Sequence, residues 1–281
     1  MRYVEKALSE PPCLAEYKKE CKDNKVPKPY LYKDFNRTSE LRRILIAEQH
    51  DVCCYCQRHC KAYRTEHSYP ENGPDVNESV KQQLEYNNLF ASCIDSSGNA
   101  PDDQYCDVKK GNIIIREFIK ETACQGYFRY NSIGEIIPNG RYYVWRDYEN
   151  ASALTENEED ACYAIRVLNL NHYSLVDARK GCLDALLSCL KKKTKEEWKA
   201  KIEEWLHSDV FPDFIELRIQ YSLRLFFMNS SIQHIYNKLP NKKTPIIFRL
   251  YPPITTEYTR NVTAAITMLR RELVKKVCIR L

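Results

Sequence analysis

The first residues with an evident capacity for chemistry are four cysteines arranged as two pairs. Cys53-x-x-Cys56 has the usual spacing of a zinc knuckle, and Cys93 and Cys106 form a second, looser pair with 12 residues between them. Tetrahedral four-cysteine zinc sites are built from two such pairs, because each tight turn presents two thiolates. The spacing therefore predicts one structural Zn²⁺ on these four residues, stapling a loop-rich segment over residues 51–111.

Other ligand sets stay open. Cys54, His59 and Cys60 lie in or beside the first pair, and Cys60 is the best rival because Cys56-x3-Cys60 is also a workable spacing. The chain holds 13 cysteines, an odd number, and it is too long to need disulfides for folding. The singly scattered cysteines elsewhere are interpreted as small buried hydrophobic residues.

Further residues capable of chemistry lie between and directly after these pairs. They are Glu66 and His67 in TEHSYP, Asn88 in YNNLFASC, and Asp107 and Lys110 in CDVKKG. With CCYC before them, this order resembles the HNH endonucleases that carry a four-cysteine zinc site, and in particular the HNH proteins of bacterial retron and Septu anti-phage systems. The segments MRYVEK, FRYNSIGEIIPN and AIRVLNLNHYSLVDAR extend the similarity over roughly residues 1–220.

Two features depart from the family pattern. Asp107 stands where these proteins usually have Asn, and the spacing between Cys93 and Cys106 is longer than theirs. The first change is chemically mild, because a carboxylate binds a hard cation at least as well as an amide does.

The resemblance implies a ββα-metal fold in which Glu66 and His67 end a strand and Asp107 lies on the following helix. Phosphodiester hydrolysis needs an activated water, and His67 is the expected general base because an imidazole titrates near working pH. Glu66 and Asp107 supply hard oxygen ligands for a catalytic Mg²⁺ or Mn²⁺. Asn88 is expected to tie the intervening loop and orient His67. Lys110, on the same helix face as Asp107, is expected to reach a phosphate.

These residues must be positioned by an α+β fold: a zinc-stapled ββα-metal (HNH) nuclease module with a mainly helical C-terminal region. We expect an N-terminal arm and helix over 1–50, the nuclease module with its four-cysteine zinc site over 51–126, and a hairpin plus a helical partner-docking region over 127–281.

Local patterns support this layout. Periodicity predicts a helix over 38–50, and alternation around Asn131–Gly134 predicts a hairpin. A third strand is expected over 141–148. Helices follow from 155, two of them opened by the capping boxes Thr155 with Glu158 and Thr194 with Glu197.

Charge and hydropathy limit the location and the partners. No run of 18 apolar residues and no export signal occurs, so a cytoplasmic protein without a membrane partner is expected. The formal net charge is +5, and residues 191–281 hold 18 Lys and Arg against 9 Asp and Glu. That excess suggests an acidic partner such as nucleic acid, although from charge alone solvated helix faces are the favoured interpretation.

The predicted function is a metal-dependent endonuclease, with DNA as the favoured substrate, acting as the effector of an anti-phage system. The resemblance implies control by a PtuA-like ATPase subunit and, in retron systems, association with the reverse transcriptase and its DNA. The chain has no G-x-x-x-x-G-K-[ST] loop, so ATP dependence would come from another chain. The alternatives are an HNH effector that cleaves tRNA or other RNA, and a non-catalytic zinc adaptor that docks the partner or nucleic acid.

Overall fold

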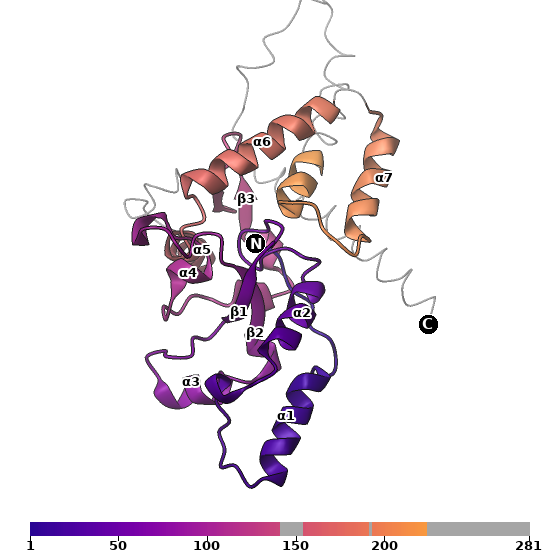
Figure 1. Ribbon diagram of the computed structural model, residues 1–281. Helices are drawn as coiled ribbons and strands as arrows, with labels where there is room; N and C mark the ends of the chain where they lie inside the picture. The colour runs from indigo at the N-terminus through magenta and orange to yellow at the C-terminus, as the bar shows by residue number, and fades with distance from the viewer. Residues whose placement is uncertain (141–153, 191–192, 224–281) are drawn as a thin grey trace, which may run out of the picture. The chain divides into compact units, whose positions relative to one another are not determined.

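The chain has an α+β architecture in the computed structural model, which describes residues 1–140, 154–190 and 193–223 (Figure 1). It divides into two compact units, Met1–Ile219 and Gln220–Leu281. The domain boundaries expected after residues 50 and 126 both fall inside the first unit. Within the described residues, no helix has the length and apolar character needed to cross a membrane.

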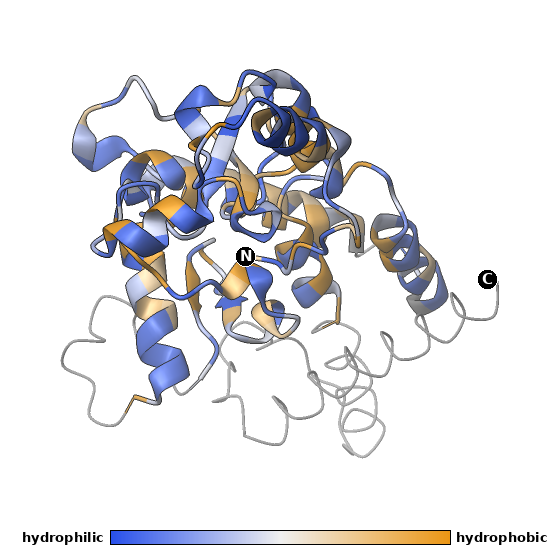
Figure 2. Ribbon diagram, turned by 90° about the horizontal axis from the view of Figure 1, so that it is seen from below, coloured by the Kyte–Doolittle hydropathy of each residue, from blue (hydrophilic) through white to orange (hydrophobic). Residues whose placement is uncertain are grey.

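Two N-terminal helices pack through short apolar stripes. Helix α1 (Pro12–Asp23) starts with proline at its first position, where no backbone donor is needed. It buries Cys13, Leu14, Tyr17 and Cys21. Helix α2 (Thr38–Glu48) lies within the predicted range of 38–50 and buries Leu41, Leu45 and Ile46. The ribbon coloured by hydropathy shows such helices with one hydrophobic and one hydrophilic face (Figure 2).

A two-stranded antiparallel sheet carries Glu66, His67 and Cys93. Strand β1 (Tyr63–His67) pairs with β2 (Leu89–Cys93), with Tyr63 opposite Cys93 and His67 opposite Leu89. The connection contains helix α3 (Val76–Gln82), capped by the Asp75 side chain, and the 3₁₀ turn η2 (Tyr86–Asn88). The one-turn helix α4 (Asp107–Lys110) follows in sequence. The register therefore places His67 and Cys93 at opposite ends of the same small sheet.

The second sheet is the predicted hairpin. Strands β3 (Phe128–Tyr130) and β4 (Ile136–Pro138) are antiparallel and enclose Gly134, which has φ 91°. A Cβ atom at this glycine would lie 2.6 Å from the carbonyl oxygen of Val176 in helix α6 (Tyr173–Leu190). Only glycine therefore allows both the turn and this close approach.

The remaining helices begin where their capping boxes predict. Helix α5 (Glu156–Val167) is capped by Thr155 with Glu158, and α7 (Lys195–Leu206) by Thr194 with Glu197. In each case the threonine and glutamate satisfy backbone donors of the first turn reciprocally. A further helical stretch runs over 215–223. The strand expected over 141–148 and most of the basic C-terminal segment lie outside the described residues.

Candidate functional site

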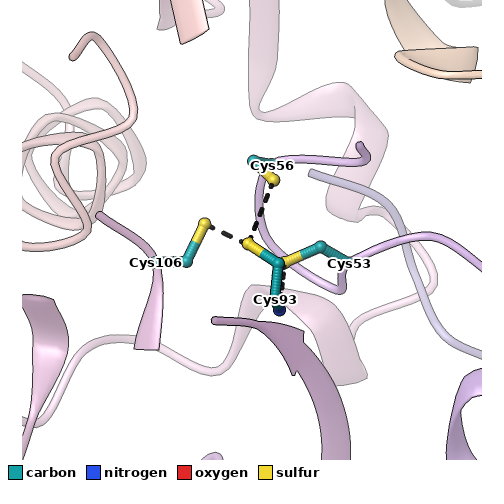
Figure 3. Close-up of side chains that lie close together, drawn as sticks. All are labelled: Cys53, Cys56, Cys93 and Cys106. Atoms are coloured by element: carbon teal, nitrogen blue, oxygen red, sulfur yellow. Dashed lines mark hydrogen bonds between the residues drawn. The ribbon is translucent and has the colours of Figure 1, made fainter. Parts of the chain in front are cut away.

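The four predicted cysteines come together as a buried cluster (Figure 3). The sulfur atoms of Cys53, Cys56, Cys93 and Cys106 all lie within 4.8 Å of one another. The sulfur–sulfur distance is 3.9 Å between Cys53 and Cys106 and 3.8 Å between Cys56 and Cys93. A tetrahedral zinc site with Zn–S bonds of about 2.3 Å has sulfur–sulfur edges of about 3.8 Å. The donor set and its dimensions therefore fit a metal such as zinc.

Three pieces of local structure present the four sulfurs, because Cys53 and Cys56 share one knuckle. The knuckle is closed by hydrogen bonds from Cys53 N to Arg58 O (2.9 Å) and from Gln57 N to Cys53 O (3.1 Å), with Gln57 at φ 63°. Cys93 ends strand β2, and its backbone N–H points at the Cys53 sulfur (3.4 Å). A thiolate accepts such a bond better than a thiol does, which is consistent with a metal-bound sulfur.

Cys106 is held in an unusual backbone conformation directly before α4. Its φ is 59° and its ψ −141°, a region that non-glycine residues rarely adopt. Its N–H donates to Leu168 O at the end of α5 (2.8 Å), and the Asn169 side chain holds the preceding loop through Asp102 O and Gln104 O. Leu168 and Asn169, which directly follow α5, therefore fix the position of the last cysteine.

The thiol groups of the cluster differ in pKa. Burial raises the pKa of Cys106 well above the ordinary thiol value. Burial acts the same way on Cys53, but hydrogen bonds from Cys106 and neighbouring thiols outweigh it and lower the pKa of Cys53 well below that value. Four buried thiols at this separation are stabilised together as thiolates only by a cation, which couples metal binding to proton release.

The rival ligands do not join the cluster. Cys60 is buried and its sulfur contacts Arg58 O (3.7 Å), while His59 is exposed. Cys54 is buried beside the cluster, and burial raises the pKa of its thiol well above the ordinary value. Among the residues described, the two predicted pairs alone form a group with metal-ligand geometry.

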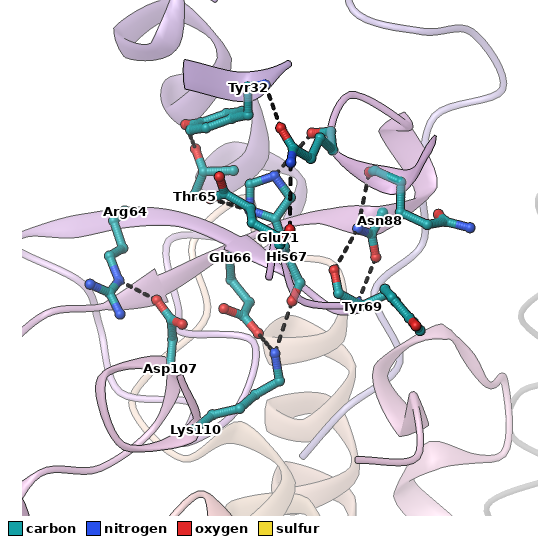
Figure 4. A network of polar contacts seen from close by, with 12 residues as sticks. Tyr32, Arg64, Thr65, Glu66, His67, Tyr69, Glu71, Asn88, Asp107 and Lys110 are labelled. Carbon is teal, nitrogen blue, oxygen red and sulfur yellow. Dashed lines mark hydrogen bonds and ion pairs between the residues drawn. The ribbon is translucent and has the colours of Figure 1, made fainter. Parts of the chain in front are cut away.

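A second polar site lies on β1 and α4 (Figure 4). The Lys110 ammonium donates to Glu66 Oε1 (2.7 Å) and to His67 O (2.9 Å), and the Tyr55 hydroxyl donates to the same Glu66 oxygen (2.6 Å). The side chains of Lys110 and Glu66 are 0% and 2% exposed. This burial does not support the phosphate contact expected of Lys110, because α4 is a single turn packed so that Lys110 points inward toward β1.

Asp107 lies beside Glu66 and binds Arg64. The Arg64 Nε donates to Asp107 Oδ2, and the Arg64 side chain is 42% exposed, so this edge of the site opens to solvent. Burial first, and then the Asp107 carboxylate, raise the pKa of Glu66 well above its usual range, against the opposing effect of Lys110. Two adjacent carboxylates with this mutual repulsion are a donor set that suits a hard divalent cation.

His67 has its two ring nitrogens in different surroundings. Nε2 lies 2.9 Å from Gln83 O, and a carbonyl can only accept, so Nε2 carries the hydrogen and Nδ1 is the basic nitrogen. Nδ1 lies 3.2 Å from a Glu71 carboxylate oxygen. The Tyr32 ring packs edge-on against the imidazole at 4.8 Å. Burial lowers the pKa of His67 to about 4, so the ring is a neutral base at physiological pH.

Asn88 ties the loop that follows His67. Its Oδ1 accepts from Tyr69 N (2.7 Å), and its Nδ2 donates to Tyr69 O (3.0 Å) and Gln82 O (3.1 Å). Its own carbonyl accepts from Ser68 N (2.9 Å). The fully buried amide therefore joins α3 to the end of β1 and fixes the chain on which His67 stands.

Sequence reasoning missed several neighbours of the proposed catalytic residues. They are Tyr32, Tyr55, Arg64, Glu71 and Gln83. Tyr55 lies inside the CCYC motif, where only the cysteines drew attention, and the other four belong to no motif with recognisable spacing. The one local signal is the position of Glu71 four residues after His67, and that spacing brings side chains together only on a helix, which this segment is not.

No protein-family model matches the chain, and no curated protein matches it at a significant level.

Proposed function

We propose that the protein is a metal-dependent endonuclease of the HNH type with a structural zinc. The observation that carries the proposal is the pairing of the Glu66 and Asp107 carboxylates beside β1, with the buried His67 as the next residue along the strand, close in sequence to a four-cysteine cluster. An inert zinc module has no need of two adjacent carboxylates followed in sequence by a buried neutral histidine. The order β1, β2, α4 also supports a ββα arrangement.

Residues of the chain would divide the chemistry as follows. Glu66 and Asp107 would hold the divalent cation, which supplies charge neutralisation at the phosphoryl oxygens. His67 Nδ1 would take a proton from water as the water oxygen bonds to phosphorus and the bond to the leaving oxygen breaks. Gln83 O keeps the imidazole in the required tautomer through Nε2. Lys110 would hold Glu66 in place.

The biological setting rests on the family resemblance. We propose an anti-phage effector that cuts DNA under the control of a PtuA-like ATPase subunit, docked through the region after residue 126. RNA or tRNA as substrate stays the alternative, and so does a zinc adaptor without catalysis. The described residues carry no observation that favours either of them.

The proposal is tested by incubating the purified, zinc-loaded protein with supercoiled plasmid, phage DNA and total tRNA, with Mg²⁺ or Mn²⁺, with and without the ATPase. We expect metal-dependent cleavage that His67→Ala reduces on the order of 10²–10⁴-fold, as is typical for loss of a general base. His59→Ala is the matched control, because His59 is an exposed histidine outside the polar site. Full activity of His67→Ala would rule out its role.

A further inference from the structure

A large open groove lies between helices α1 and α3, away from the catalytic residues themselves. Its volume is ≈ 1120 Å³, and its walls come from α1, the segment 28–30, and α3 with the two residues at 84–85. Figure 1 shows α1 and α3 below the β1–β2 pair. Five lysines and a single carboxylate line it: Lys18, Lys19, Lys22, Lys28 and Lys81, with Glu85.

Most of this positive charge is not neutralised locally. Lys18 pairs with Glu10 and lies 3.9 Å from Glu85, and Lys81 lies 3.5 Å from Glu78. Across the described part of the chain, the other three groove lysines, Lys19, Lys22 and Lys28, make no ion pair, and all three are exposed.

Clustered ammonium groups without counter-charges repel one another and favour a polyanion. Lys22 follows Lys18 by four residues and Lys19 by three on α1, so it neighbours both on the helix surface, and all three line the same groove.

Two walls of the groove continue into residues that contact His67. Tyr30 and Leu84 line the groove, and their near neighbours Tyr32 and Gln83 contact the imidazole. Tyr32 and Gln83 are themselves joined by a hydrogen bond from Tyr32 N to Gln83 Oε1 (2.9 Å). Tyr32 and Gln83 therefore connect the lining of the groove to the imidazole, although His67 itself does not line the groove.

We propose that this groove binds the phosphate backbone of a nucleic-acid strand and guides it to His67. The Lys19, Lys22 and Lys28 ammonium groups neutralise phosphates, and the half-buried Tyr30 ring offers a surface on which a base can stack. The proposal rests on the proposed nuclease function and adds where the substrate lies. An acidic protein surface is the competing occupant.

The experiment measures binding without cleavage. Full-length, zinc-loaded His67→Ala protein is titrated against a fluorescent 20-nucleotide single-stranded DNA and the corresponding duplex, by anisotropy at several salt concentrations. The test variant adds Lys19→Gln, Lys22→Gln and Lys28→Gln. The matched control adds Lys61→Gln, Lys193→Gln and Lys199→Gln, which are exposed lysines outside the groove.

We expect the groove variant to lose at least about tenfold in affinity at low salt, and the slope of log K against log salt to fall by about 2 for single-stranded DNA. The control should bind within about twofold of the parent. Equal losses in the two variants would mean general electrostatics and would overturn the groove assignment. DNA binding that is unchanged in the groove variant would also overturn the assignment. This includes the outcome in which the groove variant loses only its association with the partner ATPase.

These outcomes are separate from the test of catalysis. If the wild-type protein cleaves no nucleic acid but the groove variant still loses affinity and salt dependence, the groove stands and the nuclease proposal fails. If the wild-type protein cleaves and the groove variant binds like its parent, the nuclease proposal stands and the groove is rejected.

Discussion

Lys110 and Glu66 form a fully buried ion pair, with 2.7 Å between Nζ and Oε1 and almost no exposed surface on either side chain. Removal of one partner from such a pair leaves an uncompensated buried charge, and this is far costlier than replacement of both. The pair therefore links the integrity of the proposed metal ligand Glu66 to a lysine that solvent does not reach.

The first prediction follows from this pair. Lys110→Met should lower the free energy of unfolding by about 3–5 kcal/mol, because Glu66 then stays buried without its counter-charge. Lys110→Met combined with Glu66→Gln should recover part of that loss. Urea denaturation of the zinc-loaded proteins measures both values. Additive losses in the double variant would show that the two side chains do not depend on each other.

The second prediction concerns the zinc ligands. The purified protein should contain close to one zinc per chain by elemental analysis, and Cys93→Ser should lose it together with much of the cooperative unfolding transition. Cys54→Ser and Cys60→Ser are matched controls, because both residues are buried beside the cluster but lie outside the four-sulfur group. Retention of zinc in Cys106→Ser with its loss in Cys60→Ser would show that Cys60 is the fourth ligand.

Local patterns predicted local structure well. The capping boxes at Thr155 and Thr194 and the turn at Asn131–Gly134 each depend on residues within a few positions, so the sequence is sufficient to place them. Spacing also predicted which cysteines come together, because two pairs of thiols have few ways to surround one ion.

Tertiary contacts were not predictable in the same way. The spacing of Lys110 from Asp107 placed both on one helix face and led to the expected phosphate contact, but the orientation of that face depends on how α4 packs against β1. Tyr32 lies 35 residues before the imidazole it contacts. No local pattern encodes such a separation.

The third prediction separates the metal-binding role of Asp107 from its ion pair with Arg64. Asp107→Ala should raise the Mg²⁺ or Mn²⁺ concentration needed for cleavage, because one of the two proposed oxygen ligands is lost. Asp107→Asn should keep substantial activity, since an amide oxygen still reaches the cation. A metal titration of the cleavage rate measures both. An unchanged metal requirement in Asp107→Ala would contradict the assignment.

The fourth prediction concerns the loop behind His67. Asn88→Ala should lower the free energy of unfolding by about 2–4 kcal/mol, because backbone groups of Tyr69 and Gln82 lose their partners in a buried site, at about 1–3 kcal/mol for each unsatisfied group. Cleavage should fall as well, since the loop carries the proposed base. Asn87→Ala is the control, because Asn87 is the exposed neighbour. Equal stability of the two variants would show that the amide does not hold the loop.

The last prediction is a pH dependence of stability that comes from His67. Burial lowers the pKa of its folded form to about 4, below the value of about 6.5 in an unfolded chain. Between these values the unfolded chain binds more protons, so the contribution of His67 to stability is complete above about pH 6.5 and is lost as the pH falls toward 4. The loss is about 1.4 kcal/mol per pH unit within that window, or about 2 kcal/mol between pH 6.5 and 5.

His67→Gln isolates this contribution, because glutamine can still donate to Gln83 O but does not titrate. Glu66 and Glu71 have raised pKa values and contribute with the opposite sign; because Glu71 contacts Nδ1, both proteins carry Glu71→Gln, while Glu66 and the zinc cluster are the same in each. The difference in unfolding free energy between the proteins without and with His67→Gln, measured by urea denaturation from pH 7 to pH 5, should therefore shrink by about 2 kcal/mol on acidification. A difference that stays constant with pH would mean that the imidazole is not held neutral by burial.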